Sequence, residues 1–250
     1  MLTVGMTEGV EAVAARVSST GEDREAAVRR LAHQSTRLHG LVAFPAAITM
    51  ILFAEPLLDL WVGDRIDQAT RTENLAFIAT LVRVVSIGLL VRAISDNWQR
   101  ILYGAGFVKD FALITLAGGL LNPFLAVALI WMLPASIDYT GPATGYSIIM
   151  IVFHFILLPL SAARRLEAGY WQIMSGLWRP LVTTAACTLI YAGAFQFVDR
   201  WTAIPLAITL GAFGLAYAVG AVMFILSPQE RTRFTRAFGR RLPGSNSKPP

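Results

Sequence analysis

The sequence predicts an all-α integral membrane protein, and three observations support this fold class. Apolar residues make up 55% of the 250-residue chain and charged residues only 15%, and the mean hydropathy is +0.58. A soluble domain carries about 25% charged residues, because its surface has to face water. Six stretches of about 20 residues lack turn signals and dense charge, and a helix of that length crosses about 30 Å of hydrocarbon. We therefore expect a bundle of six transmembrane helices.

The six predicted spans are residues 40–60, 75–95, 111–133, 141–161, 177–197 and 204–225. Each is expected to be a helix, because only a helix satisfies its own backbone hydrogen bonds in lipid. Pro45 and Pro56 predict that the first helix is bent. We divide the chain into a charged cytoplasmic segment (1–39), a six-helix transmembrane domain (40–226) and a basic cytoplasmic tail (227–250).

The distribution of lysine and arginine predicts the orientation. If the N-terminus is cytoplasmic, the cytoplasmic segments hold sixteen of the 21 basic residues and the opposite side holds three. This bias alternates correctly across all six spans, as the positive-inside rule requires. Both termini are therefore predicted to be cytoplasmic. The basic residues already have this topological role, so we do not expect a nucleic-acid partner.

The two ends of the chain each leave two interpretations open. Residues 1–17 are moderately apolar but too short to span, so they form either an amphipathic helix or the end of a truncated span. Ser19 with Glu22, or Thr20 with Asp23, resembles a capping box that begins a second helix. In the tail, Phe234 and Phe238 recur among arginines, which fits either a helix lying on an anionic leaflet or a solvated topological anchor.

Arg83 and Arg92 are the two basic residues inside the second predicted span, and charges in hydrocarbon are costly enough to suggest function. Arg83 lies about 12 Å along its helix from the outer end. It either binds a phosphate or diphosphate or pairs with a carboxylate or backbone carbonyls of a neighbouring helix. Arg92 shares a helix face with Asp96 and Arg100, so an intrahelical ion-pair ladder is the alternative to substrate binding.

Asn122 and His154 are uncharged polar candidates in the third and fourth spans. Asn122 precedes Pro123, where its amide either contacts substrate or satisfies backbone groups freed by a kink. His154 is the only histidine of its span. It is interpreted either as a buried, hydrogen-bonded side chain or as a group that couples transport to protons.

Glu55 and Asp59 lie four residues apart near the outer end of the first span. They either bind a coupling cation or balance the charge of Arg65, and we favour the second interpretation. We identify Glu55 as the candidate for ion coupling.

Small residues predict two close helix contacts. Gly141 and Gly145 open the fourth span in the sequence GPATG, and a row of small residues follows one face of the sixth span. Such residues let helix backbones approach closely in membranes.

The sequence contains no motif typical of catalysis. It has one cysteine, no paired-carboxylate site and no glycine-rich phosphate loop, and the predicted outer loops are short. We therefore expect neither an enzyme nor a bound metal or cofactor.

The order of several phrases is similar to that in a known transporter family. A charged helix ending in STGEDREAAVRRL is followed by spans ending in LLDLWVGD and DNWQRILYGAGFVKD, then by LLNP and by GPATGYS. Over residues 5–165 the chain resembles the C-terminal half of polysaccharide transporters and O-antigen flippases. These belong to the multidrug/oligosaccharidyl-lipid/polysaccharide exporter superfamily.

The resemblance implies one lobe of a two-lobe exporter in the bacterial inner membrane. It implies an undecaprenyl-diphosphate-linked oligosaccharide as substrate, and a missing N-terminal lobe or a second copy as partner. The expected function is flipping of this lipid during polysaccharide or lipopolysaccharide synthesis. A non-transporting scaffold, or a truncated relic that docks on polysaccharide-assembly proteins, is the alternative.

Overall fold

The computed structural model describes residues 13–15, 24–197, 201–228 and 230–232, and these ranges contain helices and no strand. Five described stretches are long and apolar enough to cross a membrane: Ala26–Leu52, Arg71–Gly104, Val108–Met132, Asp138–Arg165 and Ala203–Ile225. The all-α membrane fold class is therefore confirmed. The fifth predicted span is also helical and forms α9 (Trp178–Phe197). It is not one of the five described stretches that are long and apolar enough to cross a membrane.

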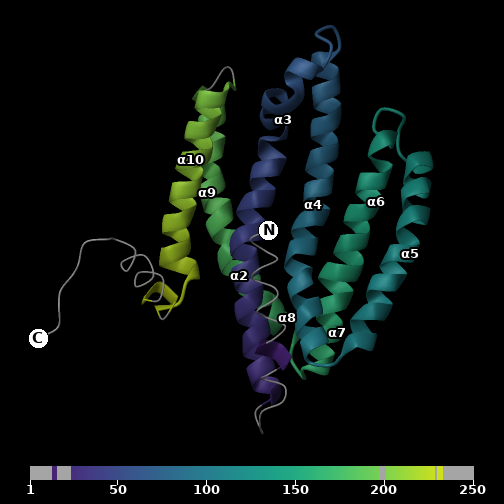
Figure 1. Ribbon diagram of the computed structural model, residues 1–250, viewed down its shortest axis with the longest axis vertical. Helices are drawn as coiled ribbons and strands as arrows, with labels where there is room; N and C mark the ends of the chain where they lie inside the picture. The colour runs from purple at the N-terminus through teal and green to yellow at the C-terminus, as the bar shows by residue number, and fades with distance from the viewer. Residues whose placement is uncertain (1–12, 16–23, 198–200, 229, 233–250) are drawn as a thin grey trace, which may run out of the picture.

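The helices run alternately up and down the bundle, with α2 (Arg24–Leu52) at its centre (Figure 1). On one side of α2 lie α4 (Arg71–Gly104), α5 (Val108–Met132), α6 (Gly141–Ile149) and α7 (Leu158–Arg165). On the other side lies a hairpin of α9 and α10 (Ala203–Gly220). The short helix α8 (Tyr170–Met174) and the 3₁₀ turn Ser175–Leu177 join the two sides. One end of the bundle is the end at which α2 begins and at which α4 and α10 finish. We call it the basic end.

The first helix continues without a break through residue 40, where the sequence predicts the membrane domain to begin. Its first half is held against α4 by buried polar contacts. Trp98 is 1% exposed and donates its indole N–H to the Thr36 hydroxyl over 2.8 Å. The Asn97 amide lies 3.3 Å from the same hydroxyl. Burial against α4 therefore makes the charged segment and the first span one 29-residue helix.

The helix breaks at Phe53 and resumes as α3 (Ala54–Val62). Pro56 is the third residue of α3 and has no N–H to continue the hydrogen-bond ladder. The predicted bend of the first span is thus a break near Pro56, whereas α2 passes through Pro45. Likewise, α5 passes through Pro123 without ending.

A tyrosine hydroxyl satisfies a carbonyl that a proline leaves without a helical partner. Pro45 cannot donate to the carbonyl of Leu41 four residues earlier, and Tyr217 of α10 donates to that oxygen over 2.8 Å. An unsatisfied carbonyl is costly in hydrocarbon, so Tyr217 stabilises the helix that Pro45 weakens. A second tyrosine, Tyr170, donates to the carbonyl of Phe155 at 3.2 Å.

The first predicted small-residue contact is confirmed. A Cβ at Gly145 would lie 3.2 Å from the Ala126 backbone of α5, and one at Gly141 would lie 2.9 Å from the Ile130 backbone. In the sixth span the predicted contact is formed at Gly220, where an added Cβ would lie 2.8 Å from the Thr183 methyl group, but not farther along the row. A Cβ added at Gly211 or Gly214 would meet no atom of a neighbouring helix within 4 Å, because that face of α10 turns away from the described helices.

A partly buried ion pair joins α2 to the chain beyond α10. Arg37 donates to Glu230, whose other carboxylate oxygen accepts the Ser227 backbone N–H at 2.7 Å. Burial raises the pKa of Glu230, but the hydrogen bonds from Ser227 and Arg37 outweigh it and hold the pKa below its ordinary value. The aromatic residues predicted to form a tail helix, and the N-terminal capping box, lie outside the described residues.

We expect Tyr217→Phe to lower the free energy of unfolding in detergent by about 1 kcal/mol, because the Leu41 carbonyl loses its donor. The loss should be smaller in a Pro45→Ala background, where residue 45 regains an N–H for that carbonyl. Thermal unfolding of the four variants gives this double-mutant cycle. Equal losses in both backgrounds would contradict the capping role.

We expect the contact between α2 and Glu230 to weaken in acid. Because the folded-state pKa lies below the unfolded value, the stabilisation is complete above the ordinary value of 4.5 and is lost as the pH falls through the folded-state pKa. Unfolding midpoints measured between pH 7 and pH 3 should therefore fall less in Glu230→Gln than in the natural chain. A Glu73→Gln variant, which changes an exposed acid at the opposite end, should follow the natural chain.

Candidate functional site

Two polar clusters lie along α4, and between them they contain all five of the predicted site residues. The outer cluster surrounds the break between α2 and α3 and contains Arg83 and Glu55. The inner cluster lies in the half of α4 nearer the basic end and contains Arg92, with Asn122 and His154 from neighbouring helices. The two clusters differ in how many of their charged side chains have ion-pair or hydrogen-bond partners among the described residues.

In the outer cluster, Arg83 is engaged by the helix break. Its Nε donates to the carbonyl of Ile51 at 3.2 Å, and its guanidinium lies 3.8 Å from the Glu55 carboxylate. Ile51 is in the last turn of α2, where the break removes the usual helical donors. Arg83 therefore caps a broken helix and balances Glu55.

The second carboxylate of this region also has a basic partner, but not the predicted one. Asp59 accepts two hydrogen bonds from Arg71, at 2.6 and 2.9 Å. The predicted pairing of this carboxylate with Arg65 is replaced because Arg71 begins α4, directly beside the end of α3. The cluster borders a cavity of about 620 Å³.

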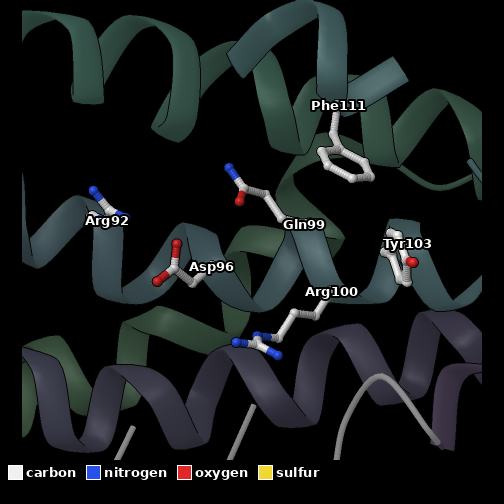
Figure 2. A pocket seen from close by; sticks show the side chains of 6 residues that line it. All are labelled: Arg92, Asp96, Gln99, Arg100, Tyr103 and Phe111. Atoms are coloured by element: carbon white, nitrogen blue, oxygen red, sulfur yellow. The ribbon is translucent and has the colours of Figure 1, made fainter. Parts of the chain in front are cut away.

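In the inner cluster, five polar or aromatic side chains occupy one face of α4. Arg92, Asp96, Gln99, Arg100 and Tyr103 follow helical spacing, and with Phe111 of α5 they line a hollow of about 490 Å³. Figure 2 shows Gln99 and Phe111 on the side toward α5 and Arg100 on the side toward α2. This face is open, whereas the opposite face of α4 is buried around Trp98.

The arginine at the start of this face is not neutralised by its neighbour. Among the described residues, no ion pair within 4 Å joins Arg92 to Asp96, although they lie one turn apart. The Arg92 side chain is exposed. The intrahelical ladder proposed for these two residues is therefore not formed, and Arg92 keeps its hydrogen-bonding capacity for another group.

A smaller cavity of about 190 Å³ extends from this face toward α5 and α6. It brings Arg92, Asn122 and His154 together, three residues that the sequence places on three different spans. The carbonyl oxygen of the Asn122 side chain is buried there and has no hydrogen-bond partner among the described residues. His154 is 6% exposed, and its Nδ1 lies 3.1 Å from the Gln99 amide nitrogen.

His154 lies on a π-helical segment, Met150–Leu157, which separates α6 from α7. This segment ends two residues before Pro159, where the missing N–H disturbs the α-helical ladder. π-Helical turns are rare and occur often at functional sites. In the sequence of the fourth predicted span, only Pro159 indicates that the α-helix is interrupted.

The length of α4 indicates how deep these charges lie. Its 34 residues are about 51 Å long, whereas the hydrocarbon core is about 30 Å thick. A core centred on α4 covers about 20 residues, from about 78 to 97. Arg83, Arg92 and Asp96 all fall within it, so this open polar face would be costly to expose to lipid.

The MatE family model matches residues 1–128, just over half of the 250-residue chain. The chain belongs to the MatE family. This membership makes it a multi-pass membrane transporter of the exporter superfamily that the sequence resembles, whose MatE members are transporters rather than enzymes. No curated protein and no solved structure matches the chain.

The matched region of this MatE chain contains the whole of α2, α3 and α4 and most of α5. Arg83, Arg92 and Asn122 therefore lie within it, and His154 lies outside. Gln99 is a site residue that the sequence analysis did not predict, and its amide contacts Thr115 and His154. Its position seven residues after Arg92, two helical turns along α4, could have predicted that it lies on the same face.

We expect Arg83→Gln to destabilise the MatE chain by about 1–2 kcal/mol, since it removes a donor to Ile51 and the partner of Glu55. Arg92→Gln is the matched control on the same helix and should leave the unfolding temperature in detergent unchanged. A stable Arg83→Gln variant would contradict the capping role and return Arg83 to the substrate-binding candidates.

Proposed function

We propose that this MatE chain is one lobe of a flippase for lipid-linked oligosaccharides, and that the inner face of α4 contacts the diphosphate and first sugars. The observation that supports this proposal most directly is the open row of polar side chains at membrane depth on α4. A lipid with a large polar head needs such a path across hydrocarbon. No covalent chemistry is involved, and we propose no enzymatic activity.

Arg92 is the proposed diphosphate ligand. A guanidinium binds phosphate oxygens through two parallel hydrogen bonds, and Arg92 has no ion-pair partner among the described residues. Sugar hydroxyls need both donors and acceptors, which Gln99 and Asp96 supply beside it. Tyr103 and Phe111 add ring surfaces at the end of the same hollow.

The coupling group is proposed to be His154 rather than Glu55. His154 lies in the same cavity as Arg92, so a change in its charge acts directly on the substrate site. Glu55 is 3.8 Å from Arg83 at the helix break. A proton or cation bound by Glu55 would compete with that ion pair.

A second lobe or a second copy of the chain is proposed to cover this face during transport. Charges at bilayer depth cost about 2.5–3.5 kcal/mol each when they face lipid, and two charged residues of this face, Arg92 and Asp96, lie within the estimated hydrocarbon core. A partner lobe would enclose a watery path between the two bundles. We propose the bacterial inner membrane as location, with the basic end in the cytoplasm.

Flipping can be measured in proteoliposomes that hold a fluorescent undecaprenyl-diphosphate oligosaccharide and the chain with its partner lobe. Outward movement exposes the label to dithionite, which bleaches it. We expect Arg92→Gln and Asp96→Asn to slow bleaching at least tenfold, because each removes a substrate contact.

Lys109→Gln is the matched control, since Lys109 is an exposed basic residue at the same end and does not line the hollow. Natural rates in Arg92→Gln would contradict the proposed ligand. If the chain reaches the membrane intact and no arrangement of lobes flips the lipid, the scaffold hypothesis takes precedence.

A further inference from the structure

A groove outside the α4 site lies between α9 and the end of α10. These two helices lie on the opposite side of α2 from α4 (Figure 1). It encloses about 650 Å³. Arg179, Val182 and Ala186 line it from α9, and Met223, Phe224 and Arg231 line it from the end of α10 and beyond. Its polarity is divided lengthwise, with arginines at the basic end and apolar side chains farther from that end.

The length of the groove matches one leaflet of a bilayer. Its lining residues on α9 run from Trp178 to Cys187, a distance of about 13 Å along a helix. Half of a 30 Å hydrocarbon core is about 15 Å. An acyl chain lying along Val182 and Phe224 would therefore remain within the leaflet at the basic end.

The mouth of the groove is cationic and its charge is fixed in place. Arg231 donates from Nε to the Leu226 carbonyl at 3.0 Å, and its guanidinium also donates to Met223. The Arg179 side chain is exposed beside it. No acidic residue of the described part of the chain lines the groove, so the mouth favours an anion.

A glycine brings the two helices together at the floor. A Cβ at Gly220 would lie 2.8 Å from the Thr183 methyl group, so α9 and α10 touch there. The groove is consequently a cleft with one closed side, and it opens outward from the bundle between Val182 and Phe224, which are 45% and 63% exposed.

We propose that this groove binds an anionic phospholipid of the bilayer, with its phosphate at Arg179 and Arg231 and one acyl chain along Val182, Ala186 and Phe224. Cations at one end and apolar side chains along the rest match an amphiphile with a single charged head. A partner helix would instead require an apolar face without the two arginines. The lipid site is separate from the proposed substrate path and does not depend on it.

The test is native mass spectrometry of the full chain released from micelles that contain equal amounts of phosphatidylglycerol and phosphatidylcholine. The natural chain should retain one phosphatidylglycerol, at least fivefold in preference to phosphatidylcholine. Arg179→Gln should abolish this preference. Arg164→Gln is the matched control, because Arg164 is an exposed arginine of the same end outside the groove, and it should retain the lipid.

A second measurement locates the lipid in a chain whose two groove arginines are unchanged. Brominated lipids quench the fluorescence of nearby tryptophans, and the difference in quenching between the natural chain and Trp178→Phe gives the contribution of Trp178, which lines the groove. This contribution should be larger in vesicles with brominated phosphatidylglycerol than in vesicles with brominated phosphatidylcholine. Equal retention and equal quenching by both lipids would overturn the proposal.

Two further outcomes would assign the groove to a different occupant and so also overturn the proposal. Displacement of phosphatidylglycerol by equimolar undecaprenyl diphosphate would make it part of the substrate path. Chains that dimerise without lipid, and that lose the dimer in Val182→Ser, would make it a protein interface. Loss of flipping with retained phosphatidylglycerol would count only against the transport proposal.

Discussion

A backbone carbonyl at membrane depth is costly unless it has a hydrogen-bond donor, and this constraint explains how the first helix is held. Pro45 and the break near Pro56 each leave a carbonyl without its helical donor. Tyr217 and Arg83 supply the missing donors from other parts of the chain. The bent and interrupted helices are therefore stabilised by the neighbours against which they pack.

This constraint also separates two arginines that look equivalent in the sequence. Arg83 and Arg92 both lie inside the second predicted span, but only Arg83 faces a broken helix. Its charge is used for capping and for Glu55, whereas Arg92 lies on the open face of α4 with Asp96 and Gln99. The need for a donor at the helix break thus gives the first arginine a structural role, whereas the second is the ligand that we propose for the diphosphate.

The sequence predicted the fold class and most helix positions, because hydropathy and charge are nearly local properties of a membrane chain. The fit is close for α5, which was expected at 111–133 and forms Val108–Met132. The sequence could not predict that α2 continues through residue 40, because that continuity depends on the contact between Thr36 and Trp98. Similarly, Asn122 and His154 were predicted separately, and only the packing of α4 to α6 brings them to one cavity.

The hairpin of α9 and α10 is fastened to the first helix at three heights. Near the end opposite the basic end, the ring of Trp201 meets Phe53 edge-on, with centroids 5.1 Å apart. Tyr217 reaches Leu41 midway, and Glu230 holds Arg37 nearer the basic end. Sliding or tilting of the hairpin against α2 would break all three attachments together, so these contacts oppose that movement. The rocking motion that costs least is therefore one that keeps the hairpin with α2 and bends the chain among the helices that follow α4.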